Sequence, residues 1–445
     1  MFKSENFRGD TMLIEFKTEN YRSFGDERKM SMRAGSSRIH GNHVFESDGM
    51  CVLVFSAVFG ANASGKSNLV RAMRDSRERI VNGIPIPRTS WNRMDPGNEQ
   101  RPTGFEYVFT TGGRVLAYGF EVIAATGEIG SEWLYDLTVE DECVFERTPG
   151  RIVTDLRDSP GYGTRLDVLE GLVGEGSRDL LLPTLVKMSG EDGDLFLRAR
   201  EAMSWFDGRL VVAAAGESIP LSNDPDRDGL VRDIMTSYDT GITGMGYEEV
   251  GYESLVFPRG LRGLLEEGIR NGGVGMVGGP SDLYRLWYDG TYRAERVVFE
   301  HDGSRFGFGE ESNGTQCLYG LLPILEPGAG DDMTYVVDEL DRSLHPLMTE
   351  RFVRDFLAMA EGCRRQLIIT THESRLQNME LLRRDEIWYA QRGLDGSTDL
   401  YSLEEFKERV DRRIERAYLD GRYGAVPRFD RFRPDSSTAS EEGGE

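Results

Sequence analysis

The stretch 58-VFGANASGKSNLVRAM-73 decides the fold of this 445-residue chain. From Gly60 to Ser67 it matches the pattern GxxxxGK[ST] in full. The apolar run 52-VLVFSAVF-59 leads into it, and residues 67–80 continue with apolar side chains at helical spacing. Strand, glycine-rich loop and helix in this order predict a P-loop, whose backbone N–H groups surround the phosphates of a nucleotide.

The residues of this loop have separate expected roles. Lys66 would bridge β- and γ-phosphate oxygens, and Ser67 would ligate Mg²⁺. Lys66 is one of only 6 lysines, against 47 arginines, so its place in the loop is unlikely to be an accident of composition. The residues expected to bind the nucleotide here are Gly60, Asn62, Ser64, Gly65, Lys66, Ser67 and Asn68.

The composition is that of a globular protein, with 39% hydrophobic and 29% charged residues. No apolar run approaches the length of a membrane span, and the N-terminus MFKSENFRGD is too charged for a secretory signal, so we expect a cytoplasmic protein with no membrane partner. The four cysteines are scattered without a CxxC pair, which indicates neither a disulfide framework nor a zinc site.

The formal net charge is −23, which argues against a general nucleic-acid coat because phosphate neutralisation needs clustered positive charge. Two stretches are locally basic, residues 71–101 and 403–434, but both mix arginines with acids and are typical of solvated helix faces.

The pattern along the chain predicts five parts. Residues 1–11 are an extension. Residues 12–150 hold the P-loop and antiparallel strands, among them 104-GFEYVFTT-111 and 114-RVLAYGFEVI-123. An inserted, mainly helical lobe is expected over 151–290, and a second ATPase part over 291–433. Residues 434–445 read as a disordered acidic tail.

Two later strands end in polar residues. The run 335-YVVDE-339 ends in Asp338 and Glu339, for which we expect separate roles: Asp338 in the Mg²⁺ shell and Glu339 orienting the attacking water. The run 369-ITTHES-374 follows one helix later, so the sheet can bring His372 beside the γ-phosphate as a sensor.

The segment 311-ESNGTQ-316 precedes the Asp-Glu strand and opens a helix. Ser312 and Gly314 at a helix N-terminus would present free N–H groups and the positive end of the helix dipole, a ready anion site. Because the chain's own P-loop already covers one face of the phosphates, we expect this segment to contact a nucleotide bound to another protomer.

Taken together, these residues resemble the ABC-class ATPases of the RecF/SMC/OLD kind. In that pattern GANASGKS is Walker A, ESNGTQ the signature, YVVDE Walker B, 341-DRSLHP-346 the D-loop with Asp341, and His372 the switch histidine. The opening 13-LIEFKTENYRSFGDE-27 looks like the family's first strands, where an arginine near Arg22 often approaches the nucleotide. The resemblance implies an α/β ABC-ATPase head with a β-rich N-terminal lobe, which binds ATP and Mg²⁺ and forms a homodimer around ATP.

A closer match is to stand-alone AAA-family ATPases similar to RloA, which are linked to phage defence and commonly accompany a Toprim-like RloB partner. The sequence departs from the wider pattern twice. No convincing Q-loop glutamine follows the P-loop helix, since Gln100 lies next to a Pro/Gly-rich turn. Fewer than 75 residues follow His372, too few for the nuclease domain that OLD proteins carry there, so any nuclease is expected in a separate chain.

The resulting prediction is a regulatory ATPase that dimerises around ATP and controls an effector in anti-phage defence. The main alternative is a RecF/SMC-like repair or maintenance ATPase that binds DNA directly. A transporter's nucleotide-binding subunit is disfavoured by the ESNGT signature, the β-rich N-terminal strands and the large insertion. A small-molecule kinase or GTPase is disfavoured because it gives no account of the ESNGTQ and ITTHES segments.

Overall fold

A computed structural model gives the fold of the chain. The predicted extension and acidic tail fall almost wholly outside the residues it describes. The described residues are 11–47, 50–155, 168–171, 173–174, 176–188, 193–219, 227–257, 261–270, 275–278, 282–326, 331–406 and 414–427.

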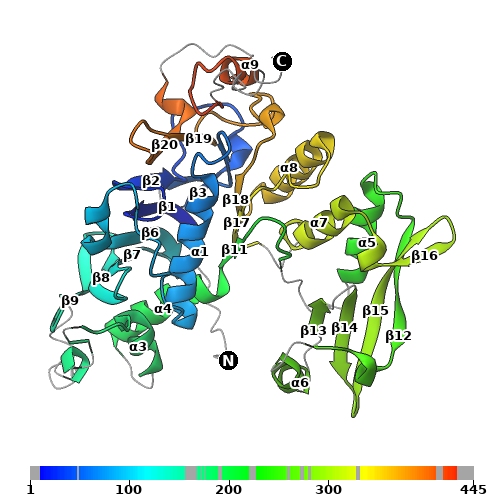
Figure 1. Cartoon of the computed structure of the whole chain (residues 1–445), viewed down its shortest axis with the longest axis horizontal. Helices are drawn as coiled ribbons and strands as arrows, with labels where there is room; N and C mark the ends of the chain where they lie inside the picture. The colour runs from blue at the N-terminus through cyan, green and yellow to red at the C-terminus, as the bar shows by residue number, and fades with distance from the viewer. Residues whose placement is uncertain are drawn as a thin grey trace, which may run out of the picture.

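A six-stranded sheet forms the centre of the molecule, in the order β11-β17-β18-β5-β19-β20 (Figure 1). Neighbours from β11 to β19 run parallel, and β20 returns antiparallel to β19. Every residue of β5, β17 and β18 is buried, as expected for strands covered on both faces. The strands are β5 (Phe55–Phe59), β11 (Leu210–Ala213), β17 (Thr334–Val337), β18 (Gln366–Thr370), β19 (Ile387–Arg392) and β20 (Thr398–Ser402).

A seven-stranded antiparallel sheet, in the order β10-β9-β8-β7-β6-β1-β2, lies beside it. It confirms the predicted N-terminal strands and meander, whose residues alternate between buried and half-exposed positions. The strands are β1 (Met12–Glu19), β2 (Arg28–Ser31), β6 (Thr103–Thr111), β7 (Arg114–Ile123), β8 (Glu128–Asp136), β9 (Glu142–Thr148) and β10 (Arg151–Val153). A separate hairpin pairs β3 (Val44–Ser47) with β4 (Met50–Leu53).

One buried amide ties the two sheets together. Gln366 Oε1 accepts from Leu13 N at 2.6 Å and from Thr334 Oγ1 at 2.9 Å, while its Nε2 donates to the carbonyls of Leu13 and Leu53, both at 2.9 Å. All the hydrogen-bonding capacity of this side chain is used, so a fully buried polar group carries no desolvation penalty here.

Three helices pack between the sheets: α1 (Lys66–Asn82), α3 (Leu181–Lys187) and α4 (Asp194–Gly208). Glu132, fully buried on β8, accepts from Leu181 N at 2.5 Å and Leu182 N at 2.8 Å and thereby satisfies the free N–H groups at the start of α3. Trp205 on α4 stacks on Phe109 of β6 at 4.3 Å. These contacts place α3 and α4 against the antiparallel sheet.

A third sheet forms a lobe on the far side of α7 from α1 (Figure 1). Its order is β12-β15-β14-β13, with β16 paired to β15, and a small core that includes Ile269, Leu286 and Ala294 holds it against α6. The elements are α5 (Arg227–Ser237), β12 (Gly244–Val250), α6 (Leu261–Arg270), β13 (Gly275–Gly278), β14 (Leu283–Tyr288), β15 (Tyr292–His301) and β16 (Ser304–Gly307).

The described residues of 151–290 hold more helix than strand, but they do not all belong to one inserted lobe. Four of their described elements are the helices α3 to α6, but β11 completes the central sheet and β12 to β14 build the third one. These strands are short and half-exposed, and their sequences are glycine-rich and of mixed polarity. Apolar and polar residues therefore do not alternate along them in the way that identifies a strand in a sequence.

The remaining helices are α7 (Asn313–Leu321), α8 (Pro346–Ala360) and α9 (Ile414–Leu419). The sequence predicts a helix from Pro346 to Ala360, which α8 confirms. It also predicts one helix from Leu403 to Tyr418, which is wrong at its start, because residues 403–405 form a short 3-10 helix and Phe406 is extended; residues 407–413 of that prediction lie outside the described residues. The 3-10 helices are η1 (Gly41–His43), η2 (Pro96–Gln100), η3 (Tyr252–Ser254), η4 (Phe308–Glu310), η5 (Leu322–Leu325), η6 (Ser374–Leu376) and η7 (Leu403–Glu405).

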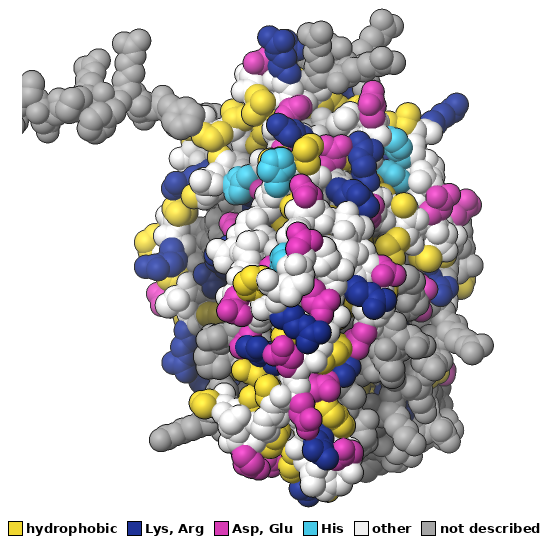
Figure 2. Space-filling view, turned by 90° about the vertical axis from the view of Figure 1, so that its right-hand side faces the viewer, with side chains coloured by type: hydrophobic (Ala, Val, Ile, Leu, Met, Phe, Trp, Pro, Cys, Tyr) yellow, Lys and Arg dark blue, Asp and Glu magenta, His cyan; other side chains and the backbone are white. Residues whose placement is uncertain are grey.

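The surface on the side of the third sheet carries basic and acidic side chains intermixed (Figure 2). No broad region of one charge sign stands out among the coloured side chains of that view. Within the described ranges, no helix is both long and apolar enough to cross a membrane.

Candidate functional site

The P-loop joins β5 to α1, as the sequence predicts. Gly65, the N-cap of α1, has φ +108°, and a Cβ at this position would collide with Thr398 Oγ1. Only glycine fits both the backbone conformation and the close approach. The loop is therefore built for backbone N–H groups to face a ligand at the start of a helix, which favours an anion.

Lys66 lies folded into this loop. Its Nζ donates to Gly60 O at 2.7 Å and to Ala61 O at 3.1 Å, and the residue is only 5% exposed. Burial lowers the pKa of Lys66 to about 8, although the carboxylates of Asp338, Asp341 and Glu339 act in the opposite direction. A buried ammonium held by two carbonyls gains much from a phosphate oxygen, which supplies the negative charge that its surroundings lack.

The first half of the loop is braced from outside. The hydroxyl of Thr398, the first residue of β20, donates to Ser64 O at 2.8 Å and accepts from the Ser23 hydroxyl at 2.7 Å. Asn68 Nδ2 donates to the same Ser23 hydroxyl at 2.8 Å. The Ser64 hydroxyl is buried and finds no partner among the described residues, so it is available to a ligand in the loop.

The Asp-Glu pair follows β17 directly. Asp338 is 6% exposed, and its Oδ1 accepts from Thr370 Oγ1 at 2.6 Å. Glu339 has φ +50°, an unfavourable conformation for a residue with a long side chain, and its N–H donates to the same Thr370 hydroxyl at 2.8 Å. The tight turn gives the two carboxylates different surroundings, which is consistent with separate roles.

Asp341 and His372 are linked through the backbone. The His372 N–H donates to both carboxylate oxygens of Asp341 at 3.2 Å. Burial, followed by the nearby positive charge of Lys66, lowers the pKa of His372, while the carboxylates of Asp341, Glu339 and Asp338 partly oppose this. The imidazole is therefore neutral at pH 7, with one N–H to donate and one nitrogen to accept.

A cavity of about 840 Å³ opens over the first half of the P-loop. Gly60, Ala61, Asn62 and Ser64 form one wall, and His372 lies beside them. The opposite wall comes from the loop after β19 and from the end of α9, where Leu394 is fully exposed and Leu419 is 61% exposed. This cavity joins the P-loop to the switch histidine.

The signature segment lies elsewhere. Ser312 is the N-cap of α7, and its hydroxyl accepts from Thr315 N at 3.1 Å. A Cβ on Gly314 would come within 2.8 Å of Ser343 O, so this position needs a glycine next to the D-loop. Among the described residues that line the P-loop cavity, none belongs to 311–316. The segment 311–316 therefore does not line the cavity over its own P-loop, although Asn313 and Gln316 line a smaller cavity together with Asp338 and Glu339.

Among the described residues, the Arg22 side chain hydrogen-bonds to Tyr21 and not to a residue of the P-loop. Arg22 adopts φ +50°, and its Nε donates to the hydroxyl of Tyr21 at 3.0 Å, which in turn donates to Asp75 on α1 at 2.6 Å. The neighbouring Ser23, through Asn68 and Thr398, is the residue of this turn that reaches the loop. A polar side chain in a strand-connecting turn gave no sequence signal for this contact.

The loop after β11, residues 214–218, was also missed by sequence reasoning. With Asp338, Glu339 and the start of α7 it lines a cavity of about 320 Å³, and its Glu217 pairs with Arg74 of α1 at 3.0 Å. It contains no glutamine, and the short apolar run 210-LVVAAAG-216 was the only hint of a strand there. Gln100 instead lies at the end of η2.

The residues present fit an Mg²⁺ ion held mainly by a nucleotide. Asp338 Oδ1 is taken by Thr370, and no described residue donates a hydrogen bond to Oδ2. Ser67, the second expected ligand, is half-buried in the first turn of α1. Within the described ranges, no group of three or more His, Cys, Asp or Glu side chains could hold a metal ion.

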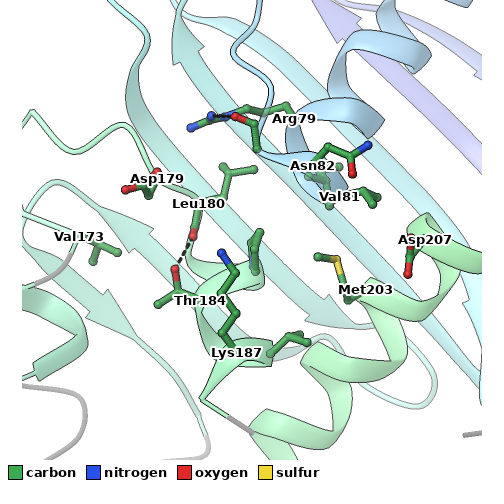
Figure 3. Close-up of a pocket in the computed structure, with 14 residues that line it drawn as sticks. Arg79, Val81, Asn82, Val173, Asp179, Leu180, Thr184, Lys187, Met203 and Asp207 are labelled. Carbon is green, nitrogen blue, oxygen red and sulfur yellow. Dashed lines mark hydrogen bonds between the residues drawn. The ribbon is translucent and has the colours of Figure 1, made fainter. Parts of the chain in front are cut away.

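A further cavity of about 500 Å³ lies at the opposite end of α1 (Figure 3). Its charged residues balance, with Arg79 and Lys187 against Asp179 and Asp207. Its wall otherwise consists largely of apolar side chains. It lacks both a glycine-rich loop and a carboxylate pair among its described residues, so it is not the candidate site.

The pKa of Lys66 leads to a prediction about pH. Below pH 8 Lys66 of the free protein is protonated. Above pH 8 it is mostly neutral, so ATP binding, which favours the protonated lysine, requires the uptake of a proton. We expect the KM for ATP to rise above pH 8, by up to about tenfold per pH unit. Initial rates from pH 6.5 to 9.5 measure it. The Lys66→Arg variant should show no such rise of KM with pH, whatever its KM at pH 7, because a guanidinium does not titrate in this range. If the KM of the parental protein stayed constant up to pH 9.5, Lys66 would not be the phosphate-binding lysine.

Comparison with known proteins agrees with this geometry. A family model described as "AAA domain, putative AbiEii toxin, Type IV TA system" matches residues 277–376, which include the signature, the Asp-Glu turn and the switch histidine. No curated protein matches the chain.

The chain also matches several solved structures over most of its length. An SMC head bound to the C-winged helix domain of ScpA is 13% identical with a TM-score of 0.40, over 88% of this chain and 97% of that one. The SMC head domain from Thermotoga maritima is 14% identical at 0.33, over 88% and 98%. The recombination mediator RecF with ATP is 14% identical at 0.32, over 90% and 100%.

The P-loop, the Asp-Glu turn and the histidine meet at the carboxyl edge of one parallel sheet, and the AAA family model covers two of these three. Residues 277–376, which carry the Asp-Glu turn and the histidine, are therefore similar to an AAA domain.

Proposed function

We propose that this chain binds and hydrolyses ATP with Mg²⁺, and that hydrolysis resets a switch between two copies. One observation carries the proposal. Lys66, Asp338, Glu339, Asp341 and His372 come from three separate segments of the sequence, yet the three carboxylates lie close enough to act on the pKa of both Lys66 and His372. Such a convergence of a phosphate-binding lysine with carboxylates and a neutral imidazole suits phosphoryl transfer to water.

In this proposal Glu339 accepts a proton from the attacking water as the water oxygen bonds to the γ-phosphorus and the bond to the bridging β–γ oxygen breaks. Lys66 stabilises the negative charge that develops on the leaving ADP. The neutral imidazole of His372 donates a hydrogen bond from its ring N–H to a γ-phosphate oxygen. Mg²⁺, when bound, offsets negative charge on the β- and γ-phosphates. Asp341 holds the backbone of His372 in place through the two hydrogen bonds described above.

The position of the signature supports a head-to-tail homodimer. Ser312 and Gly314 lie against the D-loop side of the chain, and the P-loop cavity lacks them. In a pair of copies related by a two-fold axis, the signature of each would approach the P-loop of the other. The exposed side chains of Leu394 and Leu419 at the cavity mouth are suited to contact with a second chain.

Two copies closing over ATP would give a two-state switch, which is the form of device that controls an effector. We propose a role in anti-phage defence with a separate effector, such as a Toprim-like RloB-type protein. The sequence resemblance to RloA-type ATPases supports this, and so does the description of the matching family, which refers to a toxin–antitoxin system. Copurification of the chain with the products of its neighbouring genes, with and without ATP, tests it.

Direct DNA binding, as in RecF, is the alternative. The net charge of −23 argues against it, and the coloured side chains on the face drawn in Figure 2 form no broad basic patch for a duplex. Tight duplex binding by the isolated protein, weakening steeply with added salt, would favour this alternative over effector control.

Mixing two inactive variants tests the shared site. Lys66→Ala removes nucleotide binding from one copy and Ser312→Arg blocks the signature of the other, so neither variant alone should hydrolyse ATP. A mixture contains heterodimers with one intact P-loop facing one intact signature, and we expect it to recover up to about a quarter of the parental rate, since half of the dimers are mixed and each has one working site of two. ATP turnover by the mixture, at fixed total protein, is the measurement.

Each variant mixed with itself is the control. If Ser312→Arg hydrolysed ATP at the parental rate, or if no mixing ratio restored activity while Ser312→Arg still bound ATP, the two-copy site would be wrong.

A further inference from the structure

Thr370, the last residue of β18, stands between the two carboxylates of the Asp-Glu turn. Its hydroxyl donates to Asp338 Oδ1 at 2.6 Å and accepts from Glu339 N at 2.8 Å. Its carbonyl accepts from Leu340 N at 3.1 Å. Thr370 is fully buried, and three consecutive residues of the turn are therefore bonded to one residue of the neighbouring strand.

The chemistry of the groups fixes which of them donates and which accepts in these hydrogen bonds. A hydroxyl can donate once and accept at the same time, so one threonine serves a carboxylate that only accepts and an N–H that only donates. The bond to Oδ1 fixes the rotation of the Asp338 carboxylate and leaves Oδ2 as the oxygen for a metal. The bond from Glu339 N holds that residue at φ +50°, a conformation that needs support from its surroundings.

We propose that Thr370 is a positioning residue for hydrolysis: its hydroxyl sets the metal-facing oxygen of Asp338 and the backbone of the general base Glu339 together. This inference rests on the proposed ATPase function. It adds that the switch strand, which continues into His372, and the Asp-Glu turn are one rigid unit. Asp341 completes that unit from the other direction, because its carboxylate accepts from the His372 N–H.

Thr370→Val tests the inference, because valine has nearly the same shape and lacks the hydroxyl. We expect kcat to fall about 100-fold, while the affinity for ATP changes less than threefold because Lys66 and the P-loop are untouched. The Mg²⁺ concentration that gives half the maximal rate should rise about tenfold, since Asp338 loses its fixed rotation. A residue that only filled space would alter thermal stability without changing the Mg²⁺ dependence.

Thr370→Ser keeps the hydroxyl and should retain at least a third of the parental kcat, whereas Thr370→Ala should behave as the valine variant does. The Ser/Ala pair decides the matter even if Thr370→Val folds poorly. Thr154→Val, at a buried threonine that follows β10 at the edge of the antiparallel sheet, is the matched control and should keep both kcat and Mg²⁺ dependence.

Equal rates for Thr370→Ser and Thr370→Ala, or a parental kcat and Mg²⁺ dependence in Thr370→Val, would overturn the positioning role. Failure of the proposed function is a different result: the parental protein itself would then show no Mg²⁺-dependent turnover, whichever residue stood at 370.

Discussion

Replacing Glu339 by glutamine is expected to lower ATP turnover at least 100-fold while ATP still binds. The amide keeps the size and the hydrogen-bonding reach of the carboxylate but cannot take a proton from water, and general-base catalysis contributes roughly 10²–10⁴ in rate. Because Lys66 and the P-loop are unchanged, the variant should accumulate in its ATP-bound form. We expect a stable dimer with ATP and Mg²⁺ and a monomer without them.

Two measurements separate the steps. Phosphate release gives the rate, and light scattering after gel filtration with and without ATP gives the mass. Glu350→Gln is a matched control, because Glu350 pairs with Arg354 on the exposed face of α8 and touches none of the site. Parental turnover by Glu339→Gln would remove Glu339 from the chemistry, and a monomer in saturating ATP would remove the closed dimer.

The parts of the site that the sequence predicted are those fixed by local rules. A glycine-rich loop between a buried strand and a helix has one backbone solution, and the structure has Gly65 at φ +108° at the start of α1. The β17 and β18 runs are apolar on both faces, so their place in a central parallel sheet followed from composition alone. Asp338 and His372 then lie at the same edge of the sheet because both follow parallel strands.

The contacts that the sequence did not predict depend on segments far apart in the chain. Thr398 braces the P-loop from 334 residues away, and the Thr370 hydroxyl bridges the Asp-Glu turn across 32 residues. Threonine is common in strands for its own reasons, so neither residue had a distinguishing pattern. Strand β11 was overlooked because it has only four residues and lies between stretches that read as helix and loop.

The third sheet is a second part of the fold that the sequence alone did not predict. Its strands β12 and β14 are half-exposed along most of their length, so their apolar residues do not alternate strictly. Pairing with β15 stabilises them, through contacts such as Tyr247 with Val297 and Leu286 with Ala294. When pairing with a neighbouring strand, rather than the local pattern of apolar residues, decides that a segment is a strand, reading a single sequence assigns the wrong secondary structure to it.

Lys66→Ala is expected to weaken ATP binding about 100-fold or more. The ammonium makes charge-assisted hydrogen bonds with phosphate oxygens, and the loss of roughly 3 kcal/mol of such contacts corresponds to about two decades in Kd. Titration calorimetry with ATP and Mg²⁺ measures it. Lys29→Ala, at an exposed lysine on β2, is the control and should bind ATP as the parent does.

The same variant should fold as well as the parent, or better, when no nucleotide is present. Burial lowers the pKa of Lys66 in the folded chain to about 8, below its unfolded value, so the unfolded chain binds the proton more tightly. The lysine therefore opposes folding fully below pH 8, and this effect fades as pH rises toward 10.5. Thermal unfolding without ATP should show Lys66→Ala at or above the parental Tm at pH 7, with the difference shrinking by pH 10. A variant that lost ATP binding because it unfolded would instead show a lower Tm at both pH values, and the weaker binding would then say nothing about phosphate contact by Lys66.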